Sequence, residues 1–144
     1  MISSIRKFFR KKPLVVVIRL DGVIGAVSRF GSGGLDDSNT QKLLEKAFEF
    51  EKAKAIAIKI NSPGGSPTQS SLIASRILKL SEEKKIPVFC FCEDVAASGG
   101  YWLACAGEEI YSDINSIIGS IGVISASFGF SELISRYGIE RRVY

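Results

Sequence analysis

Short apolar runs alternate along the chain with longer segments whose apolar positions recur every three or four residues. The run Leu14–Ile18 is continuous and rich in valine, which is typical of a strand covered on both faces. This alternation predicts βαβ units, and therefore an α/β fold around a mainly parallel sheet. We expect strands at residues 14–18, 55–60, 86–92, 109–111 and 121–125 and from residue 139 onward, with helices at 97–106 and near 131–137 besides the two described next.

Two further helices carry start signals. Ser38 or Asn39 is expected to cap a helix that runs to about Lys52. Ser66 is expected to cap the next one, with Pro67 at its first position, where the missing N–H costs nothing. Before the first of these helices, residues 31–34 are expected to form a flexible loop. The side chains predicted to face the sheet are Leu43, Leu44, Ala47 and Phe48 on the first helix and Leu72, Ile73, Ile77 and Leu80 on the second.

The charge distribution divides the chain into an arm, residues 1–13, and one domain, residues 14–144. The net charge is +4, but five basic residues lie before Pro13, and the rest holds 14 basic and 15 acidic side chains. A near-neutral body lacks the basic stripe of a nucleic-acid-binding protein. We expect the arm either to be a solvated tail or to contact an anionic membrane surface, with Phe8 and Phe9 as apolar contacts. No apolar run approaches the ~20 residues of a membrane-spanning helix.

The counts of cysteine and histidine restrict the possible chemistry. Cys90, Cys92 and Cys105 have no Cys-x-x-Cys spacing, so we expect no metal site, buried reduced thiols and a cytosolic location. Cys105 is expected in the core. There is no histidine, which excludes a Ser-His-Asp triad within this chain. The base of any nucleophilic chemistry must then be a lysine, a carboxylate or a group from a partner.

Two glycine-rich turns, each expected to connect a strand to a helix, are the places where chemistry is predicted. In residues 62–65 the glycines allow backbone N–H groups to approach a ligand, next to a helix N-terminus. In residues 97–100, Ser98 lies among small residues and precedes a free N–H that could receive an oxyanion. The alternative for each turn is ordinary loop and cap chemistry. Tyr101 and Trp102 could line a substrate pocket or pack in the core.

Three blocks in this order and spacing resemble the signature blocks of the signal peptide peptidase A family (protease IV, SohB) of serine peptidases. The blocks are Asn61-Ser-Pro-Gly-Gly-Ser66, Ala97-Ser-Gly-Gly-Tyr101 and Gly119-Ser-Ile-Gly-Val123, and the resemblance extends over about residues 14–144. It implies a ClpP/crotonase-like fold, self-association as a homo-oligomer, no cofactor, and a Ser-Lys dyad that cleaves peptides within or beside membranes. A protein of this kind is expected in the cytoplasm, peripheral at the inner face of the membrane.

The resemblance also implies roles for single residues. Ser98 would be the nucleophile, the N–H groups of Gly65 and Gly99 would form the oxyanion hole, and Ser120 would help to hold the base lysine. The segment around Gly119 to Val123 would pair with an extended substrate whose small or apolar side chains enter shallow pockets. The residues expected to bind substrate are Gly64, Gly119, Ile121, Gly122 and Val123.

The base lysine is the part of the family pattern that the sequence lacks. In single-domain members it lies roughly fifty residues after the nucleophile, so we expect it just beyond Tyr144, in a chain that is truncated here. The last lysine is Lys85, before Ser98, and Lys59, the lysine nearest a motif, is expected to be a strand-end residue that reaches solvent. Two alternatives remain open: an inactive homologue or fragment that joins active subunits or binds peptides, and a crotonase-like enzyme that uses the backbone N–H groups on a thioester.

Overall fold

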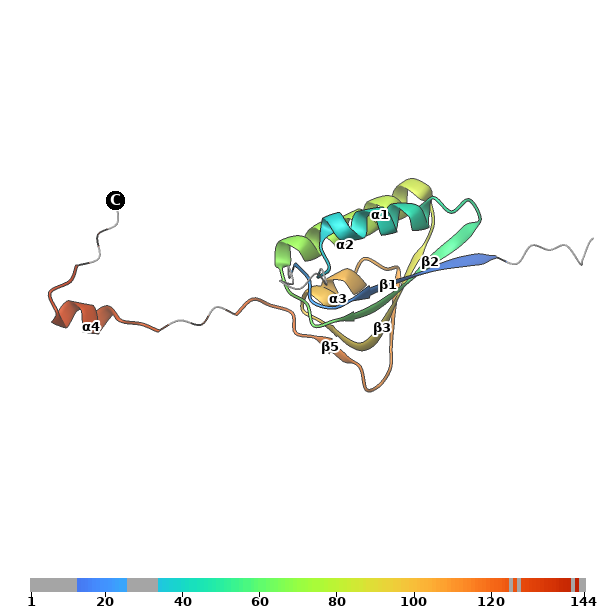
Figure 1. Cartoon of the computed structure of the whole chain (residues 1–144). Coiled ribbons are helices and arrows are strands. Elements are labelled where there is room, and N and C mark those ends of the chain that lie inside the picture. The colour runs from blue at the N-terminus through green and yellow to red at the C-terminus, as the bar shows by residue number, and fades with distance from the viewer. Residues whose placement is uncertain (1–12, 26–33, 125, 127, 141, 143–144) are drawn as a thin grey trace, which may run out of the picture.

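A parallel sheet with helices on one face forms the centre of the fold (Figure 1). The computed structural model describes residues 13–25, 34–124, 126, 128–140 and 142. The sheet has the order β1-β2-β3-β4, with β5 also paired to β3, and every pairing is parallel. The predicted α/β class is therefore confirmed. The elements are β1 (Leu14–Asp21), α1 (Asp37–Phe48), β2 (Ala53–Ser62), α2 (Pro67–Lys84), β3 (Val88–Ala97), α3 (Gly99–Ala104), β4 (Glu109–Ser112), β5 (Ile117–Gly119) and α4 (Ser131–Arg136).

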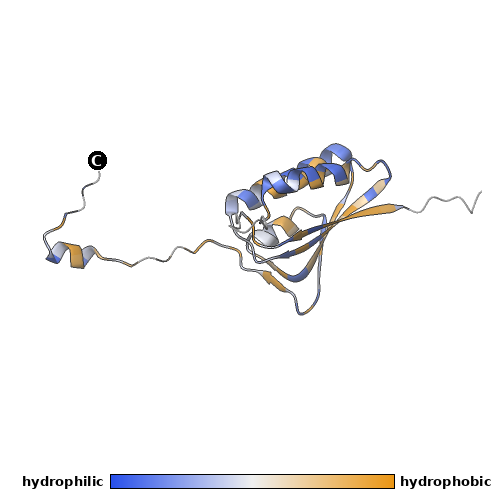
Figure 2. Ribbon diagram, viewed as in Figure 1, coloured by the Kyte–Doolittle hydropathy of each residue, from blue (hydrophilic) through white to orange (hydrophobic). Residues whose placement is uncertain are grey.

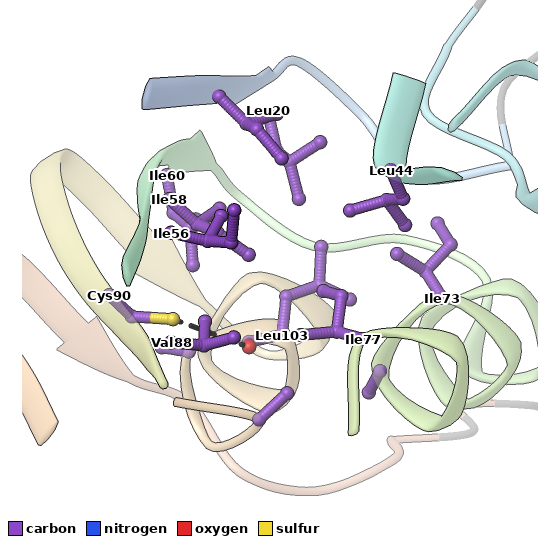
Figure 3. Packing of buried hydrophobic residues seen from close by; sticks show 14 of the residues in the cluster. Leu20, Leu44, Ile56, Ile58, Ile60, Ile73, Ile77, Val88, Cys90 and Leu103 are labelled. Atoms are coloured by element: carbon purple, nitrogen blue, oxygen red, sulfur yellow. Dashed lines mark hydrogen bonds between the residues drawn. The ribbon is translucent and has the colours of Figure 1, made fainter. Parts of the chain in front are cut away.

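The core lies between the sheet and the helices α1, α2 and α3 (Figure 3). Successive strand residues point to opposite faces, so every second residue of β1, β2 and β3 enters this layer. Ile58 in the middle of β2 has no exposed surface, and its truncation to alanine would cost about 2–5 kcal/mol. Figure 2 shows the same division, with apolar residues along the strands and polar residues over much of α1 and α2. The fully buried core side chains include Leu20, Leu44, Ile56, Ile58, Ile60, Ile73, Ile77, Val88, Cys90 and Leu103.

The first strand is not covered on both faces as its sequence predicts. Val15 and Val17 are 48% and 62% exposed, while Ile18 and Leu20 are buried. Within the described residues, β1 pairs only with β2, and the helices that contact the sheet lie on its other face. A continuous apolar run therefore does not distinguish a strand between two layers from a strand with one open face.

The start of α2 is predicted correctly and that of α1 is not. Ser66 Oγ accepts the N–H of Gln69 at 3.4 Å, and Pro67 occupies the first turn, as expected. The cap of α1 is Asp36, whose carboxylate accepts the N–H of Asn39 at 2.7 Å, so the predictions of Ser38 or Asn39 as the cap are wrong. The carboxylate of Asp36 also accepts hydrogen bonds from the side chains of Ser38 and Asn39, which explains why it occupies the cap position.

The apolar faces of the two long helices are narrower than predicted. Leu44, Ala47 and Phe48 are buried on α1, which ends at Phe48 and not near Lys52. Ile73 and Ile77 are buried on α2, and Leu80 is partly buried. Leu43 and Leu72 are 44% and 46% exposed, so their predicted inward orientation is wrong. Each lies one position before a residue that contacts the sheet, about 100° around the helix.

The part after β4 differs most from the sequence-based expectation. Residues 121–124 form no strand, because Ser120 and Gly122 have positive φ values of 53° and 146°, which interrupt an extended backbone. The strand that does form in this region is β5, a few residues earlier, and it pairs with β3. The strand predicted from residue 139 is absent at residues 139, 140 and 142, and α4 lies apart from the sheet (Figure 1).

Three sequence-based expectations fall wholly or partly on residues that the structure does not describe. They concern the arm at residues 1–12, the loop at 31–33, and the ends of the two C-terminal strands at residues 125, 141, 143 and 144. Among the described helices, none is both long enough and apolar enough to span a membrane.

Candidate active site

Three turns meet at one edge of the sheet, where β1, β2 and β3 have their carboxyl ends. The turns are residues 22–25, 61–66 and 97–100, and isolated bridges join Ile24 to Leu35 and to Gly65. In open parallel sheets, ligands bind at the carboxyl ends of the strands. The two glycine-rich turns identified in the sequence are therefore neighbours in the fold.

Ser98 stands between β3 and α3 in a strained backbone conformation. Its φ and ψ are 52° and −119°, a combination that L-residues rarely adopt. Its N–H donates to the carbonyl of Gly119 at 2.7 Å, and its carbonyl accepts the N–H of Trp102 at 3.0 Å. The side chain is partly exposed and makes no capping bond to α3. A strained, conformationally fixed serine with an accessible hydroxyl is what a nucleophile at a tight strand-to-helix turn requires.

The glycine turn at 64–65 lies directly against the turn that carries Ser98. A Cβ on Gly64, which has a φ of 96°, would lie 2.7 Å from the nitrogen of Gly99 and 2.8 Å from Ser98 Cβ. Gly65 is held from its other side by Ile24, whose N–H donates to the carbonyl of Gly64 at 2.9 Å. A Cβ on Gly65 would overlap the carbonyl oxygen of Ile24. Only glycine allows the three backbone segments to approach this closely.

Two backbone N–H groups at this junction have no acceptor among the described residues. They belong to Gly65 and to Gly99, the latter being the first residue of α3. An N–H in the first turn of a helix has no intrahelical partner and is free to bind a ligand. Gly99 follows Ser98 in the chain and Gly65 belongs to the turn that packs against it, so both unoccupied N–H groups lie close to Ser98 in the fold.

A pocket of about 500 Å³ opens over Ser98. Its wall is almost wholly apolar or glycine, with Ser98 and Cys105 as the other contributors. Tyr101 and Trp102 line it, and Tyr101 also packs against the core, so both of the alternative roles considered for these aromatics occur. The pocket brings together six of the residues singled out in the sequence, namely Gly65, Ser98, Gly99, Ile121, Gly122 and Val123, and adds Pro67 and Cys105 to them.

Three of the predicted site residues lie outside this pocket. Gly64 packs behind Ser98, and Gly119 acts through its carbonyl, which receives the N–H of Ser98. Ser120 is exposed and has a positive φ of 53°. Gly64 and Gly119 thus support the turn that carries Ser98, and Ser120 is not part of the pocket lining.

The thiols differ sharply in their surroundings. Cys90 is buried, and burial raises the pKa of its thiol to about 12, while burial also raises the pKa of Cys92. Cys105 is exposed and lines the pocket, so its predicted place in the core is wrong. No periodic signal marks this position, because α3 has only six residues and Cys105 caps its end. Within the described part of the chain, no group of three or more His, Cys, Asp or Glu side chains could hold a metal ion.

Comparison with known proteins decides the family. The sequence model of Peptidase family S49 matches residues 81–144. The chain is 36% identical to Serine protease SPPA, chloroplastic, of Arabidopsis thaliana, over 88% of this chain and 19% of that protein. This chain belongs to the signal peptide peptidase A family.

The other comparisons extend this assignment. A solved structure called 1510-N membrane-bound stomatin-specific protease matches with a TM-score of 0.60 and 22% identity, over 88% of this chain and 59% of that one. This likeness confirms the ClpP/crotonase-like fold. The chain is also 52% identical, over 96% of its length, to a segment of a protein from Brucella melitensis named Na(+)/H(+) antiporter NhaA. The chain spans about a fifth of the Arabidopsis protein and of the Brucella protein, 19% in each case. The antiporter name therefore describes a protein most of which lies outside the match.

The resemblance noted in the sequence implies a lysine base, so the positions of the lysines are compared with the pocket. No lysine of the described residues lines the pocket. Lys59 in β2 is half-exposed and forms an ion pair with Glu93 of β3, which Arg19 of β1 also contacts at 2.9 Å. Hydrogen bonding to Lys59 holds the pKa of Glu93 below its usual value, and the charge of Arg19 acts in the same direction. The side chain of Lys59 is thus directed to the carboxylate of Glu93 and does not reach the pocket beside Ser98.

The sequence-based reasoning missed the ion cluster that Arg19, Lys59 and Glu93 form on the sheet. Arg19 and Lys59 are register partners in β1 and β2, and Glu93 extends to them from β3. The signal for this cluster is a pair of basic residues on adjacent strands with an acidic residue on the next strand. It can be recognised only when the register between the strands is known.

Proposed function

We propose that this chain is the nucleophile-bearing part of a serine peptidase that cleaves apolar peptide segments. The observation that carries the proposal is the junction of Ser98 with the N–H groups of Gly65 and Gly99 in one apolar pocket. Membership of a peptidase family supports it.

The proposed reaction is acyl transfer through Ser98. Its Oγ attacks the carbonyl carbon of the scissile peptide bond and gives its proton to a base. The carbonyl oxygen becomes an oxyanion, which accepts the N–H groups of Gly65 and Gly99. Return of the proton to the amine expels the leaving peptide, and water then hydrolyses the ester on Ser98 by the same steps. The hydrogen bond from the N–H of Ser98 to Gly119 keeps the nucleophile in place throughout.

The base is proposed to be a lysine that these 144 residues do not contain. The sequence has no histidine, and the pocket has no lysine from the described residues. A base lysine must be neutral near pH 7, which requires burial and a lowered pKa. Ser120, which precedes the pocket residue Ile121 in the chain, is the proposed orienting group for that lysine.

The pocket wall supports a peptide with small or apolar side chains as the substrate. The segment 119–123, of which Ile121, Gly122 and Val123 line the pocket, is proposed to lie beside an extended substrate peptide. We further propose that the domain at 14–144 assembles as a homo-oligomer. The basic arm at 1–13 is proposed to hold it at the inner, cytoplasmic face of a membrane.

The test is cleavage of an internally quenched apolar peptide by the native polypeptide and its variants. Ser98→Ala is expected to lower kcat/KM by at least about 10³-fold, as loss of a nucleophile does. Ser112→Ala, an exposed serine at the end of β4, is the matched control and should retain full activity. Unchanged cleavage in Ser98→Ala would refute the proposal.

The same variants separate the two other candidate functions. The lack of a pocket lysine among the described residues favours an inactive peptide-binding protein, which would bind the apolar peptide with equal affinity with or without Ser98 and cleave none of it. A crotonase-like enzyme would act on a thioester, and Ser98→Ala would leave that activity largely intact because only the backbone N–H groups are needed.

A further inference from the structure

Asn61, the first residue of the glycine turn, connects three segments of the site edge. Its Oδ1 accepts the N–H of Val95 at 3.2 Å, and its Nδ2 donates to Asp94 Oδ2 at 3.3 Å. Its backbone carbonyl accepts the N–H of Gly22 at 3.0 Å. One side chain thus joins β2 to β3, while its backbone joins β2 to the turn after β1.

These contacts lie where the β2–β3 ladder is interrupted. Ile60 is paired with Cys92, but Ser62 is paired with Ala96, so one residue of β2 stands opposite three residues of β3. Such a bulge leaves backbone groups without ladder partners. The side chain of Asn61 supplies an acceptor for one of them, the N–H of Val95. An amide suits this position because it carries both the acceptor for Val95 and the donor for Asp94.

The bonds of Asn61 lie where the two turns of the site begin. Gly64 lies three residues after Asn61, and Ser98 lies three residues after Val95. The two turns that start there meet in the contact between Gly64 and Gly99. A shift of β3 along β2 at the bulge would therefore move Ser98 relative to the N–H of Gly65. Asn61 itself does not line the pocket.

We propose that Asn61 is a positioning residue, which fixes the spacing between Ser98 and the oxyanion-binding N–H of Gly65 through its bonds to Val95 and Asp94. This inference rests on the proposed peptidase function. Because Asn61 does not line the pocket, its loss should lower kcat and leave KM nearly unchanged.

The test first replaces the amide of Asn61 by a carboxylate and then exchanges the amide and the carboxylate between positions 61 and 94. Asn61→Asp keeps an acceptor for the N–H of Val95 but replaces the donor with a carboxylate that repels Asp94. We expect kcat to fall about 10–100-fold, the scale of a displacement near 1 Å, with KM changed less than about 2-fold. The double variant Asn61→Asp, Asp94→Asn restores a donor and an acceptor in reversed order and should recover kcat to within about 3-fold of the parent.

A matched control is Asn115→Asp, which makes the same chemical change in the exposed turn at residues 113–116. It should leave kcat unchanged. Thermal unfolding of each variant shows whether it is folded, and the double variant keeps the test valid if Asn61→Asp alone is unstable. The inference is overturned if Asn61→Asp has parental kcat, if the exchange fails to rescue it, or if KM and not kcat changes.

Failure of the proposed function has a different signature. In that case the parent neither cleaves the peptide nor forms an adduct at Ser98 with a serine-directed phosphonate, and the positioning role is refuted with it. An active, labelled parent with unaffected variants refutes the positioning role alone.

Discussion

Replacement of Ser98 by glycine is expected to stabilise the protein while it removes the proposed nucleophile. Ser98 has φ 52° and ψ −119°, where a non-glycine residue is strained by about 1–3 kcal/mol. Glycine adopts this conformation freely, but it loses more conformational entropy on folding than serine does, which offsets about 0.5–1 kcal/mol of the gain. The hydroxyl makes no capping bond to α3 that would be lost. The net gain should be about 1 kcal/mol, or roughly 4 °C in the thermal midpoint.

Urea unfolding of three proteins tests this prediction. Ser98→Ala removes the hydroxyl but keeps the Cβ and therefore the strain, so its free energy of unfolding should stay close to that of the parent. Ser98→Gly should be the most stable of the three, with an unchanged m-value. A glycine variant no more stable than the alanine variant would show that Ser98 does not hold a strained backbone, and the argument for a preformed nucleophile turn would be wrong.

Three further predictions concern the support of the site. Gly64→Ala should lose about 2–4 kcal/mol in urea unfolding, since its Cβ would overlap the nucleophile turn at positive φ, whereas Gly129→Ala, with no atom within 4 Å, should be neutral. Glu93→Gln should be less stable than the parent at pH 7 but equal to it near pH 2, because Lys59 lowers the pKa of Glu93 and that stabilisation disappears as the carboxylate is protonated; a constant difference would contradict the ion pair. Iodoacetamide should alkylate Cys105 alone in the folded protein and slow peptide cleavage, as mass spectrometry and kinetics would show.

Local chemistry in the sequence is enough to predict several parts of the fold and of the site. Ser66 and Pro67 define the start of α2 by themselves, and the alternation of strands and helices indicates the parallel sheet. The turn around Ser98 stands out because small residues flank a serine directly after an apolar strand. The three ordered blocks indicate the family without any tertiary information.

What the sequence could not provide depends on tertiary contacts. The open face of β1 follows from the helices, which cover only the other face of the described sheet, and the apolar run at Val15–Val17 does not reveal this. The cap of α1 is a local exception: Asp36, Ser38 and Asn39 are all residue types that cap helices, and only the structure shows that the carboxylate of Asp36 accepts the N–H of Asn39. The role proposed for Asn61 requires the bulge in the β2–β3 register, and no spacing in the chain indicates it.

Covalent labelling tests the central claim, that Ser98 is the nucleophile of a serine peptidase, most directly. The native polypeptide is treated with a fluorophosphonate, digested, and mapped by mass spectrometry. We predict one adduct per chain, on the peptide that contains Ser98, absent in Ser98→Ala and still formed in Ser112→Ala. An unlabelled Ser98, or an adduct on another serine, would contradict the account.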